Sequence, residues 1–208
     1  MALADLIAQG SLWRGSEEAA AHTGDVEPSG YPELDALLAG GGWFKGQLIE
    51  LLYAAEGCGE LRLLWPLLQR YQKPDGLVIW VDPPFQPYPL ALIQAGISLS
   101  SQRVVRTGSM KERLWATEQA LKSGCAPLVL SWLGPQVSTA ALRRLQLAVQ
   151  EGGGLGWMMR PEQVREQPSP AGYRLHLRPG LAAAELTLLK RRGGWPLPPT
   201  ELELPAVV

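Results

Sequence analysis

Apolar and polar residues alternate along this chain in blocks that predict strands and helices in turn. Continuous apolar runs bounded by turn residues are typical of buried strands, whereas apolar residues three and four positions apart indicate helices. We therefore expect a strand entering at Glu50 and a Leu-rich helix that continues to about Tyr71. The same pattern then predicts strands at 77–82, 103–106, 127–133, 155–161 and 173–178, a last strand from Leu186, and helices at 111–123 and 139–150.

This alternation predicts an α/β fold over residues 30–192, with a sheet that is parallel in its core and antiparallel at its end. We expect three parts. Residues 1–28 form a short N-terminal helix followed by an arm or linker, residues 29–192 form the α/β domain, and residues 193–208 form a Pro-rich extended tail.

Composition narrows the classes of partner. The chain has 208 residues, 46% of them hydrophobic, which is enough for one well-buried domain. Its net charge of −1 gives no global attraction to nucleic acid or to an anionic membrane. Basic residues outnumber acidic ones between Arg160 and Arg192, so we expect any contact with nucleic acid to be weak or indirect.

Cysteine and histidine are too sparse for a metal site or a disulfide framework. The two cysteines, Cys58 and Cys125, and the two histidines, His22 and His176, show no ligand spacing, so we expect no metal and a structural role for His176. The start of the chain lacks the pattern of a signal peptide, and no apolar run is long enough to span a membrane. We expect a cytoplasmic protein.

The segment after the strand at Glu50 has the layout of a phosphate-binding loop without its chemistry. In the pattern G-x-x-x-x-G-K-[ST], the lysine holds phosphates and the hydroxyl holds Mg²⁺. Here Ala54 takes the first glycine position and Gly59 the second, while Glu60 replaces the lysine and Leu61 the hydroxyl. We expect a degenerate loop and no bound cofactor. An ordinary strand–turn–helix, with glycines serving the turn, is the simpler alternative.

The residues before this loop resemble RecA-type recombinases. The matching positions, in order, are Ser29-Gly30, Leu34-Asp35, Gly41-Gly42, Gly46 and Glu50. The resemblance implies a RecA-like core with a mostly parallel central sheet flanked by helices. It also implies lost catalysis, because Pro84 stands where the catalytic Glu follows Asp82, and Ser131 stands where an Asp supports Mg²⁺. A proline cannot act as a general base, so we expect no catalytic residues and no enzyme.

Several longer phrases resemble ImuA, a RecA-like accessory family of bacterial damage-induced mutagenesis. They are Trp13-Arg14-Gly15, Gly41-Gly42-Trp43, Gly59–Leu64, Ala140–Gln146 and Leu189–Gly194. The resemblance implies a non-catalytic role in SOS-induced translesion DNA synthesis. The implied partners are ImuB and/or RecA, and indirectly an error-prone DnaE-type polymerase.

A second resemblance stays open beside the first. Ser131-Trp132-Leu133 and Trp157–Pro161 are similar to SulA, the SOS cell-division inhibitor that binds FtsZ. The resemblance to SulA implies FtsZ as the partner, in place of a polymerase or a recombinase. A third reading, an active RecA-like ATPase, is disfavoured because Ala54, Glu60, Leu61, Pro84 and Ser131 together remove the required chemistry.

Two segments are candidate partner-binding sites. The first is Leu12, Trp13 and Arg14 in the arm, since Trp is enriched at interface hot spots. Trp13 could instead pack on the core of its own domain. The second candidate is the basic turn Lys190, Arg191 and Arg192.

Overall fold

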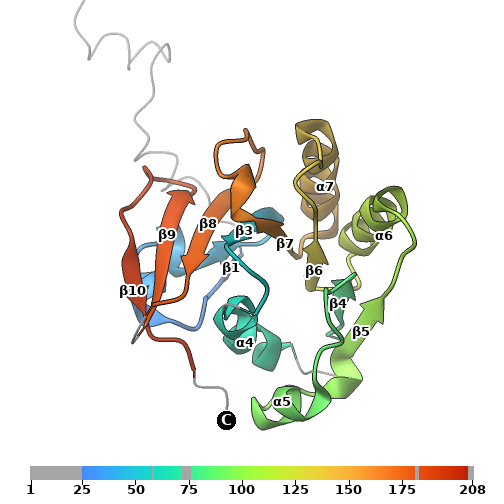
Figure 1. Ribbon diagram of the computed structural model, residues 1–208, viewed down its shortest axis with the longest axis horizontal. Helices are drawn as coiled ribbons and strands as arrows, with labels where there is room; N and C mark the ends of the chain where they lie inside the picture. The colour runs from blue at the N-terminus through green and yellow to red at the C-terminus, as the bar shows by residue number, and fades with distance from the viewer. Residues whose placement is uncertain (1–24, 58, 72–75, 181–182, 206–208) are drawn as a thin grey trace, which may run out of the picture.

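The protein folds around one large β-sheet with helices on both faces (Figure 1). The computed structural model describes residues 25–57, 59–71, 76–180 and 183–205. Leu12, Trp13, Arg14 and the expected N-terminal helix lie outside these residues. Their proposed part in partner binding stays a prediction.

Within the described residues the large sheet has eight strands, in the order β10-β9-β8-β3-β7-β6-β4-β5. Their bounds are β3 Gln47–Tyr53, β4 Val78–Val81, β5 Gln102–Val105, β6 Leu128–Trp132, β7 Leu155–Pro161, β8 Tyr173–Arg178, β9 Ala184–Lys190 and β10 Thr200–Leu202. A separate two-stranded sheet pairs β1, Val26–Glu27, with β2, Trp43–Phe44.

The sheet is mixed, which corrects the expected RecA-like core with a mostly parallel central sheet. The six strands from β8 to β5 run parallel to their neighbours. In contrast, β9 is antiparallel to β8 and β10 is antiparallel to β9. Only residues 179–183 join β8 to β9, and so short a connection forms a hairpin, whereas a parallel crossover needs a dozen residues or more.

Helices cover the two faces of the sheet. Helix α4, Glu60–Arg70, lies on one face, and α6, Met110–Lys122, and α7, Thr139–Gly152, pack together on the other (Figure 1). The shorter helices are α3 Pro32–Asp35, α5 Pro89–Gln94, η1 Ala39–Gly41, η2 Leu99–Ser101 and η3 Glu162–Val164. Side chains of the caps Ser109 and Ser138 accept hydrogen bonds from backbone N–H groups in the first turns of α6 and α7.

Alternate residues of the central strands supply two cores. Ile49, Leu130 and Trp157 pack with the apolar side of α4, whereas Leu48, Val129 and Met158 pack with α6 and α7. Successive side chains of a strand point to opposite faces, so a central strand covered on both faces is apolar at most of its positions. This is why these strands form hydrophobic runs in the sequence, interrupted by single buried polar residues such as Glu50 and Ser131.

Two glycines of the segment before β3 are required by close packing. Gly30 has φ +91°, and an added Cβ would lie 2.2 Å from the Cβ of Pro66 in α4. A Cβ on Gly42 would lie 2.4 Å from the backbone oxygen of Glu27, because β1 and β2 approach each other there. Gly30 and Gly42, two of the glycines that suggested a RecA-type segment, thus have structural roles in this chain.

Candidate partner-binding surface

A cleft of about 560 Å³ opens where the parallel strands end at their carboxyl termini. Its walls come from the segments after β3, β4, β6 and β7, and include Ala54, Glu56, Pro84, Trp132 and Pro135. Ligands of open α/β sheets bind at this edge of the strands. The cleft is therefore the first place to look for function.

The degenerate phosphate loop forms one wall of the cleft. The carboxylate of Glu60 lies at the N-terminus of the helix that follows the loop. Glu60 is the first residue of α4 and is 5% exposed. Its Oε1 accepts a hydrogen bond from the backbone N–H of Gly57 at 3.1 Å. Leu61 packs against the core, Ala54 is exposed, and Gly59, with φ +100°, precedes the helix. A carboxylate thus receives the type of N–H donor that a phosphate would need.

Asp82 lies in the cleft wall, and both of its carboxylate oxygens accept hydrogen bonds from other segments of the chain. Its Oδ1 accepts the Thr107 N–H at 2.7 Å, and its Oδ2 accepts from the Thr107 hydroxyl and from Arg113 Nε at 2.6 Å. Burial alone would raise the pKa of Asp82, but the hydrogen bonds from Thr107 and Arg113 outweigh it and lower the pKa. Arg113 also donates to the Trp132 carbonyl at 2.9 Å, so Asp82 fixes this wall.

A buried ion network holds the loops that follow β6 and β7. Glu50 of β3, which is fully buried, accepts Arg160 Nη1 at 2.9 Å and Arg174 Nε at 2.7 Å. Arg174 also donates to the carbonyls of Val164 and Arg165, both at 3.0 Å. Arg160 lies within 3.5 Å of the carbonyls of Pro135 and Val137. The network thus links the centre of the sheet to the loops that follow β6 and β7.

Exposed apolar side chains gather in the segment that continues from the cleft after Pro84. Phe85 is 68% exposed and Tyr88 is 64% exposed, and Leu90 and Ile93 of α5 are also more exposed than buried. The segment is anchored rather than loose, because Arg106 donates to the carbonyls of Pro83 and Phe85, and Leu92 is buried. An apolar segment held on the surface in this way is suited to binding another protein.

Sequence reasoning missed this apolar segment. Its signal was a run of apolar residues interrupted by Pro83, Pro84, Pro87 and Pro89 after a buried strand. Prolines prevent such a run from joining a sheet, so its apolar side chains have no strand partner to pack against.

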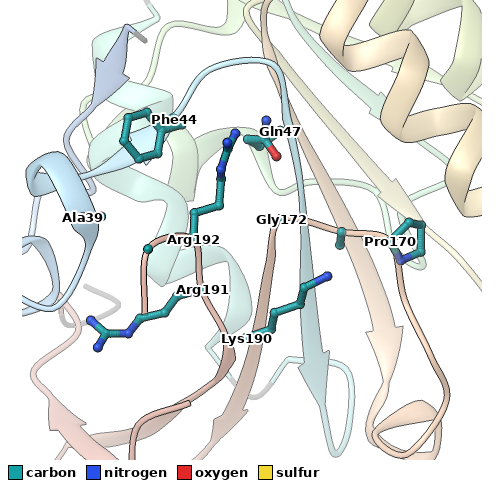
Figure 2. A pocket seen from close by; sticks show the side chains of 10 residues that line it. Ala39, Phe44, Gln47, Pro170, Gly172, Lys190, Arg191 and Arg192 are labelled. Carbon is teal, nitrogen blue, oxygen red and sulfur yellow. The ribbon is translucent and has the colours of Figure 1, made fainter. Parts of the chain in front are cut away.

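The predicted basic turn lies apart from the cleft. Lys190 ends β9, Arg191 and Arg192 follow it, and all three line a second pocket (Figure 2), which shares no lining residue with the cleft. Arg191 has a structural role, because it donates to the carbonyl of Trp195 at 2.9 Å and to that of Leu37. The turn's part in partner binding stays a prediction.

These features describe a mixed-sheet α/β protein with a cleft at the carboxyl ends of its parallel strands and an anchored, exposed apolar segment. Comparison with known proteins then gives the family. The family model described as "Cell division inhibitor SulA" matches residues 46–156, slightly more than half of the 208 residues. The chain therefore belongs to the SulA family.

Individual SulA proteins show the same similarity. SulA of Photorhabdus laumondii is 35% identical over 116 residues, which are 56% of this chain and 65% of that protein. SulA of Yersinia enterocolitica is 32% identical over 134 residues, covering 64% of this chain and 79% of that protein. The crystal structure of SulA from Pseudomonas aeruginosa matches with a TM-score of 0.45 at 24% identity, covering 54% of this chain and 97% of that one.

The family corrects the ImuA hypothesis. The matched model and relatives are SulA proteins, so the resemblance to ImuA, the role in translesion synthesis and the partners ImuB, RecA and the DnaE-type polymerase are wrong. The RecA-like fold is wrong for the same reason. The family is described by inhibition of cell division, and the absence of enzymatic activity in this chain stays a prediction. No helix in the described part of the chain is long and apolar enough to cross a membrane.

Proposed function

We propose that this protein is a SulA-type inhibitor of cell division that binds FtsZ in the cytoplasm and acts after DNA damage. The observation that carries the proposal is the family match over residues 46–156. That span runs from the start of β3 into β7 and so contains the degenerate loop, the Asp82 wall and the exposed apolar segment.

The test of the function uses cells and purified protein. Expression of the full chain in a rod-shaped bacterium should produce filaments, and the purified chain should bind FtsZ and reduce its assembly. Deletion of the gene in its own host should prevent filamentation after DNA damage. Normal division under expression, together with no measurable binding to FtsZ, would refute the proposed function.

We assign the contact with FtsZ to the apolar segment that begins at Phe85. Exposed aromatic side chains on a fixed backbone lose little conformational entropy on binding and contribute most of the affinity at hot spots. The double variant Phe85→Ala/Tyr88→Ala should therefore raise the Kd for FtsZ about 30-fold, which corresponds to roughly 2 kcal/mol. Both side chains are exposed, so its melting temperature should equal that of the unchanged chain.

The matched control is Trp195→Ala, which removes an aromatic side chain that is 86% exposed and lies outside the family match. It should bind FtsZ with unchanged Kd. If the double variant also binds FtsZ with unchanged Kd, the contact lies elsewhere on the protein. The proposed function is tested separately, by the binding of FtsZ to the unchanged chain.

We also infer that the loop between β3 and α4 binds no nucleotide. Two features support this: the Glu60 carboxylate accepts the Gly57 N–H, and Leu61 packs into the core where a metal-binding hydroxyl would be needed. Calorimetric titration of the chain with Mg-ATP should show no saturable heat at millimolar nucleotide. A saturable signal would contradict this interpretation of the loop.

A further inference from the structure

The second pocket, beside the basic turn, has the features of a binding site of its own. Its volume is about 270 Å³, and its walls come from the segment before β3, the segment before β8 and the turn after β9. Except for Gln47, its lining residues lie outside the span that matches the SulA family. The proposed contact with FtsZ therefore does not account for this pocket.

Three basic residues, Lys190, Arg191 and Arg192, line the pocket, and none has a carboxylate partner within residues 25–57, 59–71, 76–180 and 183–205. Figure 2 shows Arg192 extending between Phe44 and Gln47, and Lys190 extending toward Pro170. The Arg192 guanidinium lies 5.5 Å from the centre of the Phe44 ring. This stacking holds its direction and leaves the N–H groups at its edge free to donate.

Lys190 is held at the pocket with part of its hydrogen-bonding capacity unused. Its ammonium donates to the Ser169 carbonyl at 3.1 Å. Burial lowers the pKa of Lys190, the positive charge of Arg174 lowers it further, and Glu50 offsets part of this. Glu50 already binds Arg160 and Arg174, so its charge is shared. An anion in the pocket would relieve the cost of keeping Lys190 charged.

A buried amide completes the site. Gln47 is 7% exposed and lines the pocket, and within the described residues its side-chain amide makes no hydrogen bond to the rest of the chain. The amide is not among the enclosed unpaired polar atoms, so it faces the open space of the pocket and can donate to or accept from a ligand there. Gly172 keeps the space beside it open, because a Cβ there would lie 2.4 Å from Gln47 Oε1.

We propose that this pocket binds an oxyanion, a phosphate or carboxylate group carried by a small molecule. A guanidinium, an ammonium and an amide are the donors that such groups take in proteins. The volume of about 270 Å³ fits the anionic group with a short organic body attached. Arg191 does not bind the anion, because its guanidinium already donates to backbone carbonyls.

The proposal can be tested on the full chain by NMR titration with inorganic phosphate and, separately, with acetate, at constant ionic strength. The backbone signals of Gln47, Gly172 and Gly193 should shift saturably with at least one of the two anions. If only phosphate gives saturable shifts, the group that the pocket binds is a phosphate. If acetate gives equal saturable shifts, the group is a carboxylate. Both results support the proposal.

Three variants locate the binding. Lys190→Met and Arg192→Met should each raise the Kd at least tenfold. Gly172→Ala should raise it at least threefold with no change in charge, because the new methyl group displaces the Gln47 amide. Arg143→Met, at an exposed position on α7, changes the charge equally and should leave the Kd unchanged.

Two results would refute the proposed anion-binding site. One is the absence of saturable shifts with either anion in the unchanged chain. The other is an equal Kd in all four variants, with circular dichroism showing that each is folded, since the anions would then be binding to surface charge in general.

Discussion

Replacing Glu50 with Gln should lower the free energy of unfolding by about 3–5 kcal/mol, a large part of the roughly 5–15 kcal/mol of a typical domain. Glu50 is fully buried and pairs with Arg160 and Arg174, which are 1% and 9% exposed. The neutral amide would leave two buried guanidinium groups without a counter-charge. Chemical denaturation followed by circular dichroism measures the change, as a lower midpoint at constant slope.

Two further variants separate charge from packing. Glu201→Gln, at an exposed position on β10, removes the same charge and should change the free energy of unfolding by less than about 0.5 kcal/mol. The triple variant Glu50→Met/Arg160→Met/Arg174→Met removes every charge of the network and should be more stable than Glu50→Gln alone. If the triple variant is the less stable of the two, the network contributes through its hydrogen bonds and not through charge balance.

The network also connects stability to function. Arg160 and Arg174 hold the carbonyls of Val137, Val164 and Arg165 in the loops after β6 and β7, and Pro135 and Pro161 of the same two segments line the cleft. A residue in the middle of β3 therefore sets the shape of a surface formed by distant segments. Glu50 was recognised in the sequence only as the acid that enters the strand, because its two partners lie 110 and 124 residues further along the chain.

The hydrophobic pattern predicted the central elements well because those elements are buried on both faces. The strands expected at 155–161 and 173–178 are confirmed at the same residues, and the helix expected at 139–150 is confirmed with two further residues. Order within the sheet could not be read from the pattern. β3 lies between β7 and β8, and only side-chain packing across the strands specifies that arrangement.

Short elements escaped prediction because their sequences carry little periodicity. The segment expected to be an extended tail contributes β10, three residues long, whose Leu202 is 4% exposed. Arg62 of α4 donates to the carbonyls of Leu204 and Pro205, which holds this segment against the helix. A Pro-rich composition indicates extended backbone, but it does not tell whether that backbone joins a sheet.

Two of the phrases that suggested ImuA have structural roles in this molecule. In Leu189–Gly194, Gly193 has φ +68°, and a Cβ on Gly194 would lie 2.6 Å from the guanidinium carbon of Arg191. In Gly41-Gly42-Trp43, Gly42 admits the close approach of β1, and Trp43 is buried. Residues that a fold requires can be shared by proteins with different partners, so these phrases could not decide between ImuA and SulA.

Trp43→Ala gives the sharpest test of that structural role. Trp43 is 1% exposed, and its ring meets those of Trp157 and Tyr173 edge to face, with centroids 5.3 Å and 5.1 Å away. Removing it leaves a large cavity and ends both ring contacts, so the free energy of unfolding should fall by about 3–5 kcal/mol.

The exposed Trp195 provides the matched control, because Trp195→Ala removes the same side chain from a position without core contacts. It should leave the denaturation midpoint unchanged within about 0.5 kcal/mol. Trp43→Ala should retain the unchanged chain's Kd for FtsZ at temperatures where it is still folded, since Trp43 contributes to the core and not to the surface. A weakened Kd without loss of stability would instead place the Gly41-Gly42-Trp43 phrase in partner recognition and would contradict the structural role argued for it.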